Sequence, residues 1–300
     1  MIITVLKETF KSFSDNNVLK LSASLAYYTI FSMGPLLMVI ISLCGFLFSQ
    51  EAVEGKVYEI LKNYVGGETA FSIQKMIKNV GHDNKNFFAG AIGFVFLMLG
   101  ATSIFGEIQD SVNIIWGIKA KPKINWISYF KNRFLSFSVI VSLGFLLLIT
   151  LLISSLIELV SNKLSLYFPE ATLVIFYIIN LLLTISISTL IFGTIFKVLP
   201  DAKIKWKDVM AGSIVTAILF LMGKFAISFY ITRTNVGSTF GASGSLVVLL
   251  VWAYYSAVIL FRGAEFTKAY ARLFGEDILP NNYAVKIKTI VLEKENEALN

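Results

Sequence analysis

The sequence predicts an all-α protein, a polytopic transmembrane bundle of six helices with short amphipathic helices at the N-terminus and in the first outer loop. Composition, long uncharged runs and an uneven distribution of Lys and Arg predict this fold. Apolar residues make up 56% of the 300 residues, charged residues only 15%, and the mean hydropathy is +0.74. Soluble domains contain about 45–50% apolar and about 25% charged residues. Such a chain lacks enough polar groups to cover its surface, so we expect lipid to surround most of it.

Uncharged runs long enough to cross a bilayer recur along the chain. A helix needs roughly 20 apolar residues to cross a hydrocarbon core about 30 Å thick. One run is interrupted by Lys224, which we place inside the fifth span. The predicted spans cover about residues 21–49, 87–106, 134–157, 171–196, 209–232 and 243–263. Together they form one domain, residues 1–275, and a polar cytoplasmic tail follows at 276–300.

The basic residues predict the orientation of these spans. With six crossings, 18 of the 26 Lys and Arg residues fall on the side that holds both termini, and 8 fall on the other side. Cytoplasmic loops carry the excess of Lys and Arg. We therefore expect a multi-pass protein of the cytoplasmic (inner) membrane with both termini in the cytoplasm. Three tryptophans of the inner loops are expected to anchor in the headgroup belt: Trp116, Trp126 and Trp206.

Two segments outside the spans show helical periodicity. Apolar residues recur every three or four positions in the outer loop 51–85 and in the N-terminal residues 3–13. This spacing is typical of amphipathic helices that lie on a membrane or cap a bundle. Within the first span, Pro35 removes a backbone hydrogen bond and is expected to kink the helix near Ser32.

The sequence argues against an enzyme. Its only histidine, His82, lies in a polar turn, so we expect no metal site and no histidine general base near a span. We find no P-loop and no G-x-G-x-x-G string, and we expect no cofactor. A hydrolase, nuclease or ATPase would therefore lack necessary parts.

Polar side chains inside apolar spans are the first candidates for function, because they are costly to bury in lipid. Lys224 belongs to the outer third of the membrane, where it either extends to the outer interface or binds an anion in a hydrated cavity. Helical spacing places the other polar residues in stripes that either pack helices together or line a path. The candidate path residues are Lys224, Asn180, Thr184, Ser188, Thr216 and Ser228.

A second group of polar residues is expected at the inner boundary, where several spans begin or end. Similar depth makes a salt-bridge network plausible there. It either locks the bundle or acts as an inner gate that rearranges during transport. The members of this candidate inner charge cluster are Glu107, Asp110, Asn113, Arg133, Arg262 and Glu265.

Three strings occur in the first span, in the connection between spans four and five, and in the last span. They are Leu25-Ala-Tyr-Tyr-Thr-Ile-Phe-Ser-Met-Gly-Pro35-Leu-Leu, Val198-Leu-Pro200-Asp201-Ala-Lys-Ile-Lys-Trp206-Lys-Asp-Val, and Val247–Tyr254 with Gly263-Ala264-Glu265-Phe266. In this order they resemble the YihY/BrkB-type membrane protein family over roughly residues 10–275. Gly34 and Ala211 depart from the family pattern, which has a bulkier residue and a proline there; both are local changes of helix geometry.

The resemblance implies a six-helix inner-membrane protein without a settled activity. Family members have carried the labels ribonuclease BN and virulence or serum-resistance factor. We expect a transporter, exporter or lipid-handling protein without its own ATPase, which acts on a small solute or an amphipathic lipid. The alternative is a structural protein that scaffolds the envelope, and a membrane-associated ribonuclease is the least favoured. Membrane lipids are the expected partners, nucleic acid is not expected, and the oligomeric state is open.

Overall fold

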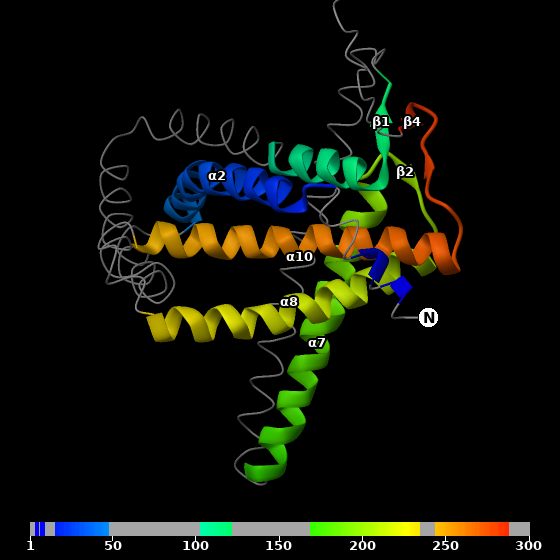
Figure 1. The fold of residues 1–300 in the computed structure, drawn as a ribbon. Coiled ribbons are helices and arrows are strands. Elements are labelled where there is room, and N and C mark those ends of the chain that lie inside the picture. The colour runs from blue at the N-terminus through cyan, green and yellow to red at the C-terminus, as the bar shows by residue number, and fades with distance from the viewer. Residues whose placement is uncertain are drawn as a thin grey trace, which may run out of the picture.

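Long helices dominate the structure, a computed structural model that describes residues 4–5, 7–9, 16–47, 103–121, 169–234 and 244–287 (Figure 1). The long helices are α2 (Val18–Leu47), α7 (Pro169–Val198), α8 (Trp206–Thr234) and α10 (Gly244–Phe274). Residues 103–116 form a further helical segment. The short strands are β1 (Ile118–Ala120), β2 (Ala202–Lys203), β3 (Leu279–Pro280) and β4 (Ala284–Lys286). The mostly helical character predicted from the sequence is thus confirmed for the described residues.

Three of these helices contain stretches long and apolar enough to cross a membrane: Val174–Val198 in α7, Trp206–Ala226 in α8 and Leu249–Phe274 in α10. The last stretch ends eleven residues beyond the predicted sixth span. The third span, most of the second span, the outer loop 51–85 and the tail beyond Ile287 lie outside the described residues. The full count of six spans therefore stays a prediction.

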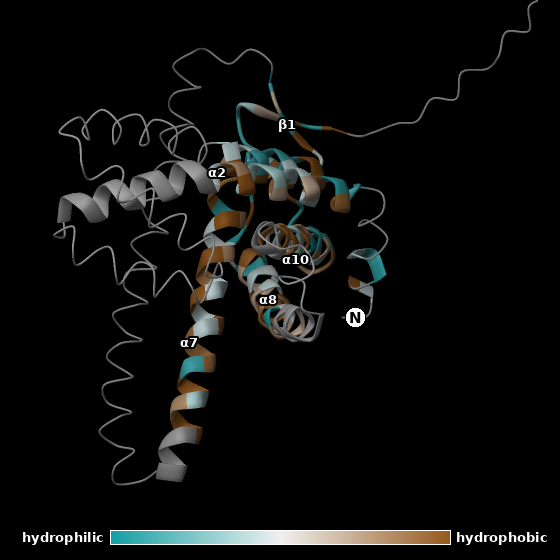
Figure 2. Ribbon diagram, turned by 90° about the vertical axis from the view of Figure 1, so that its left-hand side faces the viewer, coloured by the Kyte–Doolittle hydropathy of each residue, from teal (hydrophilic) through white to brown (hydrophobic). Residues whose placement is uncertain are grey.

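The long helices pack in a chain of neighbours. Helix α8 contacts both α7 and α10, and α10 also contacts α2. Figure 1 shows α8 and α10 side by side and antiparallel, while α7 crosses them steeply. In the rotated view of Figure 2, the N-terminal half of α7 again extends away from α8 and α10. The close contacts of α7 therefore come from its C-terminal half.

Local sequence explains where these helices begin and end. Proline is favoured in the first turn of a helix, and α7 starts at Pro169. Lys197 lies in its last turn, where a cation interacts well with the helix dipole, and Pro200 follows the end. The segment 103–116 ends at Gly117, whose φ of 70° reverses the chain into β1 and strongly favours glycine.

The strands form two small antiparallel pairs at one end of the molecule. β1 pairs with β4 in the register Lys119–Val285, and β2 pairs with β3 in the register Lys203–Leu279. The residues after α10 therefore pair with two other parts of the chain. β4 pairs with the strand that follows the segment 103–116, and β3 pairs with the connection between α7 and α8. The sequence predicts this region only as part of a polar tail, and its strand pairing was not predicted.

The apolar core lies where these connections meet the helices. Its largest fully buried side chains include Trp116, Phe196 and Phe261, from three different helical segments. The halves of the helices nearer the strands are thus held together by burial as well as by strand pairing.

Candidate functional site

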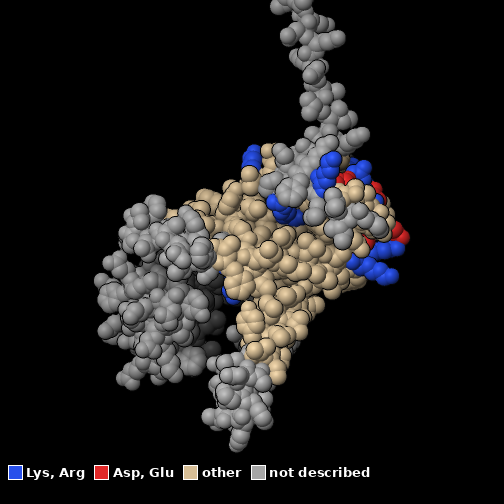
Figure 3. All heavy atoms as spheres, turned by 60° about the horizontal axis from the view of Figure 1, so that its bottom comes forward, with Lys and Arg blue, Asp and Glu red and all other residues tan. Residues whose placement is uncertain are grey.

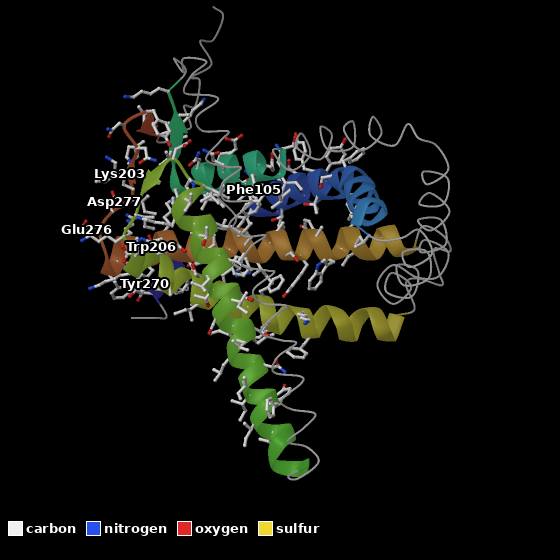
Figure 4. The ribbon with its side chains drawn as sticks, turned by 180° about the vertical axis from the view of Figure 1, so that it is seen from behind. Phe105, Lys203, Trp206, Tyr270, Glu276 and Asp277 are labelled. Carbon is white, nitrogen blue, oxygen red and sulfur yellow. The ribbon has the colours of Figure 1, made fainter. Side chains whose placement is uncertain are left out.

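Charged side chains gather at the end of the molecule that carries the strands, which we call the polar end. The surface view in Figure 3 shows Lys, Arg, Asp and Glu concentrated there and the surface of the helices largely uncharged. Figure 4 places Lys203 and Trp206 at this end, together with Glu276 and Asp277 of the segment after α10. Glu8 near the N-terminus accepts a hydrogen bond from Arg272 of α10 at 2.9 Å. The described N-terminal residues and the segment after α10 therefore lie at the same end.

Asp201 lies at the centre of a hydrogen-bond network at the polar end. It is only 4% exposed. Its carboxylate accepts hydrogen bonds from Gln109 Nε2 at 2.9 Å and from Asn113 Nδ2 at 2.9 Å, so each oxygen has a donor. Its backbone N–H donates in return to Asn113 Oδ1 at 2.9 Å. This reciprocal pair fixes the α7–α8 connection to the end of the segment 103–116.

The segment after α10 completes the surroundings of Asp201. The backbone N–H of Asn281 donates to the Asp201 carbonyl at 2.9 Å. Burial, and then the negative charge of Asp201, raise the pKa of the Tyr283 phenol above its usual 10.0. The carboxylate, the two amides and the phenol thus form a polar network from three parts of the chain, in which Asp201 and Asn113 are buried and Tyr283 is 39% exposed.

Glu265 forms a second buried polar site on α10. It is 1% exposed, and its Oε1 accepts a hydrogen bond from Asn16 Nδ2 at 2.6 Å. Asn16 lies two residues before α2, so this bond joins the start of α2 to α10. An intramolecular hydrogen bond contributes about 0.5–1.5 kcal/mol to stability. Glu265 therefore stabilises the α2–α10 contact.

The structure distributes the predicted inner charge cluster over different surroundings. Asn113 and Glu265 are buried in the two networks described above. Glu107 and Arg262 are half-buried, Asp110 is exposed, and Arg133 lies outside the described residues. Asp201, Gln109 and Asn16, which sequence reasoning did not select, supply the described partners of the two buried members.

One tryptophan prediction is wrong. Trp116 is 2% exposed and donates from Nε1 to the Ala264 carbonyl of α10 at 3.0 Å, so it is a core residue and no headgroup anchor. Its indole fills the junction between the segment 103–116 and α10, where its polar N–H still finds an acceptor. Trp206 is different: it is 56% exposed at the start of α8, and Lys197 Nζ lies 5.7 Å from its ring centroid. Trp126 lies outside the described residues.

Thr216, a predicted path residue, lies in the contact between α8 and α10. It is fully buried, and its hydroxyl donates to the Gly212 carbonyl at 2.7 Å. A Cβ added at Gly263 of α10 would lie 1.9 Å from this hydroxyl oxygen. The contact is reciprocal, because a Cβ at Gly212 would lie 1.8 Å from the hydroxyl oxygen of Thr267. For Thr216, the helix-packing alternative fits this position.

The other path residues are not brought together. Asn180 in the N-terminal half of α7 and Thr184 at its middle are both exposed, and the N-terminal half leaves the other helices in Figures 1 and 2. Ser188 is half-buried further along α7, and the side chain of Ser228 is not described. Lys224 is exposed on α8. In the described structure, the polar stripe of α7 and Lys224 therefore do not face a common site.

The chain is similar to proteins of a known membrane-protein family. The sequence model of the family called Virulence factor BrkB matches residues 9–286. The chain belongs to the BrkB family. The match includes the strand-forming residues after α10, so the BrkB-family region extends beyond the last span to β4. No solved structure matches the chain.

Curated relatives of this BrkB-family chain are named UPF0761 membrane proteins. The one from Pseudoalteromonas atlantica is 25% identical over 260 residues, which cover 86% of this chain and 82% of the relative. The one from Vibrio atlanticus is 29% identical, with 82% and 75% covered. The one from Haemophilus influenzae is 26% identical, with 85% and 91% covered. These names describe membrane proteins and assign no enzymatic activity.

Proposed function

We propose that this BrkB-family membrane protein moves an anionic amphipathic molecule, such as a lipid, across or within the cytoplasmic membrane without hydrolysing ATP itself. The observation that supports transport is an exposed lysine, Lys224, on a helix that is apolar enough to span the membrane. Its neighbours Met222 and Phe225 are also exposed, at 64% and 59%. The ammonium group therefore projects from an apolar surface.

The depth of Lys224 in the membrane determines which part of a lipid its ammonium group can meet. At 1.5 Å per residue, the 18 residues from Trp206 to Lys224 place it about 27 Å from the start of α8. Across a hydrocarbon core of about 30 Å, this puts Lys224 in the outer third. A lysine at the centre of a span costs about 2.5–3.5 kcal/mol, and near an interface it costs less because the side chain extends to the headgroups. Lys224 is thus suited to attract an anionic headgroup that enters or leaves at the outer side.

We assign the polar end to the cytoplasm. The basic residues of this end follow the distribution that Lys and Arg show in cytoplasmic loops. The shared position of the N-terminal residues and the segment after α10 supports an arrangement with both termini on the inner side. A cysteine introduced at Asn282, in a variant that lacks Cys44, should then resist an impermeant thiol reagent in intact cells and react after permeabilisation.

The transport proposal is tested in vesicles that contain purified protein and a fluorescent anionic lipid analogue. Dithionite reduction from outside measures how fast the analogue crosses from the inner leaflet. Lys224→Met should abolish the protein-dependent rate, and Lys224→Arg should retain most of it because the charge is kept. Lys119→Met is the matched control, since Lys119 is an exposed lysine on β1 at the polar end. An unaltered rate in Lys224→Met would remove this lysine from the mechanism.

A structural role in the envelope is the second candidate, and the surface of α7 favours it. Large apolar side chains are exposed along its N-terminal half, among them Tyr177 at 64% and Leu182 at 58%. Such a face suits a helix of a partner as well as lipid. A photo-crosslinking residue at Tyr177 should capture a defined membrane protein in cells if this role holds, and only lipid adducts if it does not.

A further inference from the structure

The connection between α7 and α8 and the first turn of α8 carry several exposed lysines between two predicted membrane spans. The apolar stretch of α7 ends at Val198 and that of α8 begins at Trp206, so residues 199–205 would lie at the membrane boundary when both stretches cross the bilayer. Lys203 and Lys205 of this connection and Lys207 in the first turn of α8 are all exposed. Two acidic residues accompany them, Asp201 and Asp208, and each is only 4% exposed. The acidic side chains therefore point inward, and the exposed side chains of this segment are positive.

An aromatic and an apolar side chain accompany these lysines. Trp206 is 56% exposed, and Lys197 Nζ lies 5.7 Å from its ring centroid. Lys203 on β2 pairs with Leu279 on β3, and Leu279 is 57% exposed. Paired residues of an antiparallel ladder project to the same face. The surface thus combines lysines with an indole and a leucine, as interfacial lipid-binding surfaces do.

We infer that this surface, formed by Lys203, Trp206, Lys207 and Leu279, binds the headgroups of anionic phospholipids in the leaflet at the polar end. The position of the connection between two spans places it beside the phosphate layer, which is the dense negative charge within its reach. The indole lies at the headgroup level while the lysines contact phosphates. This contact is independent of whether Lys224 takes part in transport.

The segment after α10 limits the strength of this contact. Lys205 forms an ion pair with Glu276, and the two side chains are 58% and 70% exposed. Lys203 Nζ donates to Asn282 Oδ1 at 3.0 Å, a neutral partner that leaves the lysine charge uncompensated. Lys203 and Lys207 therefore provide most of the electrostatic attraction to lipid phosphates. Lys205 contributes less, because Glu276 partly neutralises its charge. Figure 4 shows Glu276, Lys203 and Trp206 at the same end of the molecule.

The fluorescence of Trp206 provides a direct test in vesicles. Full-length protein is reconstituted into phosphatidylcholine that contains a small fraction of phosphatidylglycerol, with bromine atoms near the glycerol end of one lipid or the other. The signal that Trp206→Phe removes belongs to Trp206, which separates it from the other three tryptophans. A lysine near an anionic surface contributes about 1 kcal/mol, or about fivefold in affinity. Two lysines should therefore enrich phosphatidylglycerol about 25-fold around Trp206, a preference that is measured as quenching per mole fraction of each brominated lipid.

Substitutions distinguish lipid binding by this surface from a general electrostatic attraction between the polar end and anionic lipids. Lys203→Gln/Lys207→Gln should reduce the preference to near one, while the control pair Lys119→Gln/Lys121→Gln, on and next to β1, should leave it within twofold. Glu276→Gln should increase the preference by up to about fivefold because it releases Lys205. Equal quenching by both lipids in the native protein, or an equal loss in the control pair, would overturn the inference.

A salt titration of the native protein keeps the test decisive if a variant fails to fold. At 1 M salt the Debye length is about 3 Å, so the preference for phosphatidylglycerol should disappear while Trp206 stays accessible to both lipids. A preference that survives at 1 M salt would contradict an electrostatic contact between these lysines and phosphate groups.

Discussion

The reciprocal contact between α8 and α10 predicts that Gly212→Ala destabilises the protein. A Cβ at this position would lie 1.8 Å from Thr267 Oγ1, 2.8 Å from its Cβ and 3.2 Å from its Cα. Rotation of the threonine could move the hydroxyl, but the Cβ and the backbone of Thr267 are fixed by α10. The two helices must therefore separate, and the same holds at Gly263, where Thr216 Cβ would lie at 2.9 Å.

The size of the effect follows from two opposing contributions. Added volume in a well-packed contact costs about 1–3 kcal/mol. Replacing glycine by alanine within a helix contributes up to about 1 kcal/mol in favour of the folded state. We expect a net loss of about 1–2 kcal/mol in the free energy of unfolding. Thr267→Ala should rescue Gly212→Ala only in part, because it removes the contact at 1.8 Å and keeps the one at 2.8 Å.

Gly193→Ala is the matched control for this prediction. Gly193 lies on α7 opposite α8, and the nearest atom to an added Cβ would be Ser213 Oγ at 3.5 Å, an ordinary contact. This variant should be as stable as the native protein or slightly more stable. Unfolding of the purified protein in mixed micelles with increasing SDS, followed by circular dichroism, measures both variants. The reasoning is refuted if Gly212→Ala unfolds at the native SDS fraction, or if Gly193→Ala loses as much stability.

Other contacts of the polar end give three further predictions, all measured by the same SDS unfolding. Asn113→Leu should lower the free energy of unfolding by about 2 kcal/mol, since it leaves the buried Asp201 short of a donor. A loss in the double variant with Asp201→Ala that is smaller than the sum of the two single losses would show that the two side chains are coupled. Trp116→Phe should cost about 1 kcal/mol or more, whereas Trp206→Phe should change stability little. The raised pKa of Tyr283 means that the folded state favours the neutral phenol, so this stabilisation is complete below pH 10.0 and is lost as pH rises through the folded pKa. Above pH 10, the free energy of unfolding of Tyr283→Phe should therefore fall less steeply with pH than that of the native protein. Equal slopes would contradict the assignment.

The features that the sequence predicts well are those that depend on local composition. Uncharged runs of sufficient length identified α7 and α8 with ends within about three residues of the observed ones. The prediction for α10 ended too early because it stopped at the first charges, Arg262 and Glu265. The helix continues to Phe274, and buried Glu265 is accommodated within it because Asn16 donates a hydrogen bond to its carboxyl group.

The features that the sequence predicts poorly depend on contacts between distant segments. Asn113 was selected for its depth, but its partner Asp201 lies 88 residues away in a short connection. One local signal was available: the amides of Gln109 and Asn113 are four residues apart and so share a helical face, which suits one carboxylate between them. The role of Trp116 required knowledge of α10, because its acceptor is the Ala264 carbonyl.

These contacts divide the described structure into parts with different opportunities for movement. Gly212 and Gly263 hold α8 and α10 at a fixed, close separation, and Asp201 and Glu265 join the polar end of this pair to the segment 103–116 and to the start of α2. The N-terminal half of α7 has no such bonds among the described residues and leaves the pair at a steep angle. A conformational change that kept the polar end intact would therefore alter the angle of α7 to α8 and leave the α8–α10 pair unchanged. Lys224 lies on this fixed pair, and so a molecule bound there would meet a rigid surface.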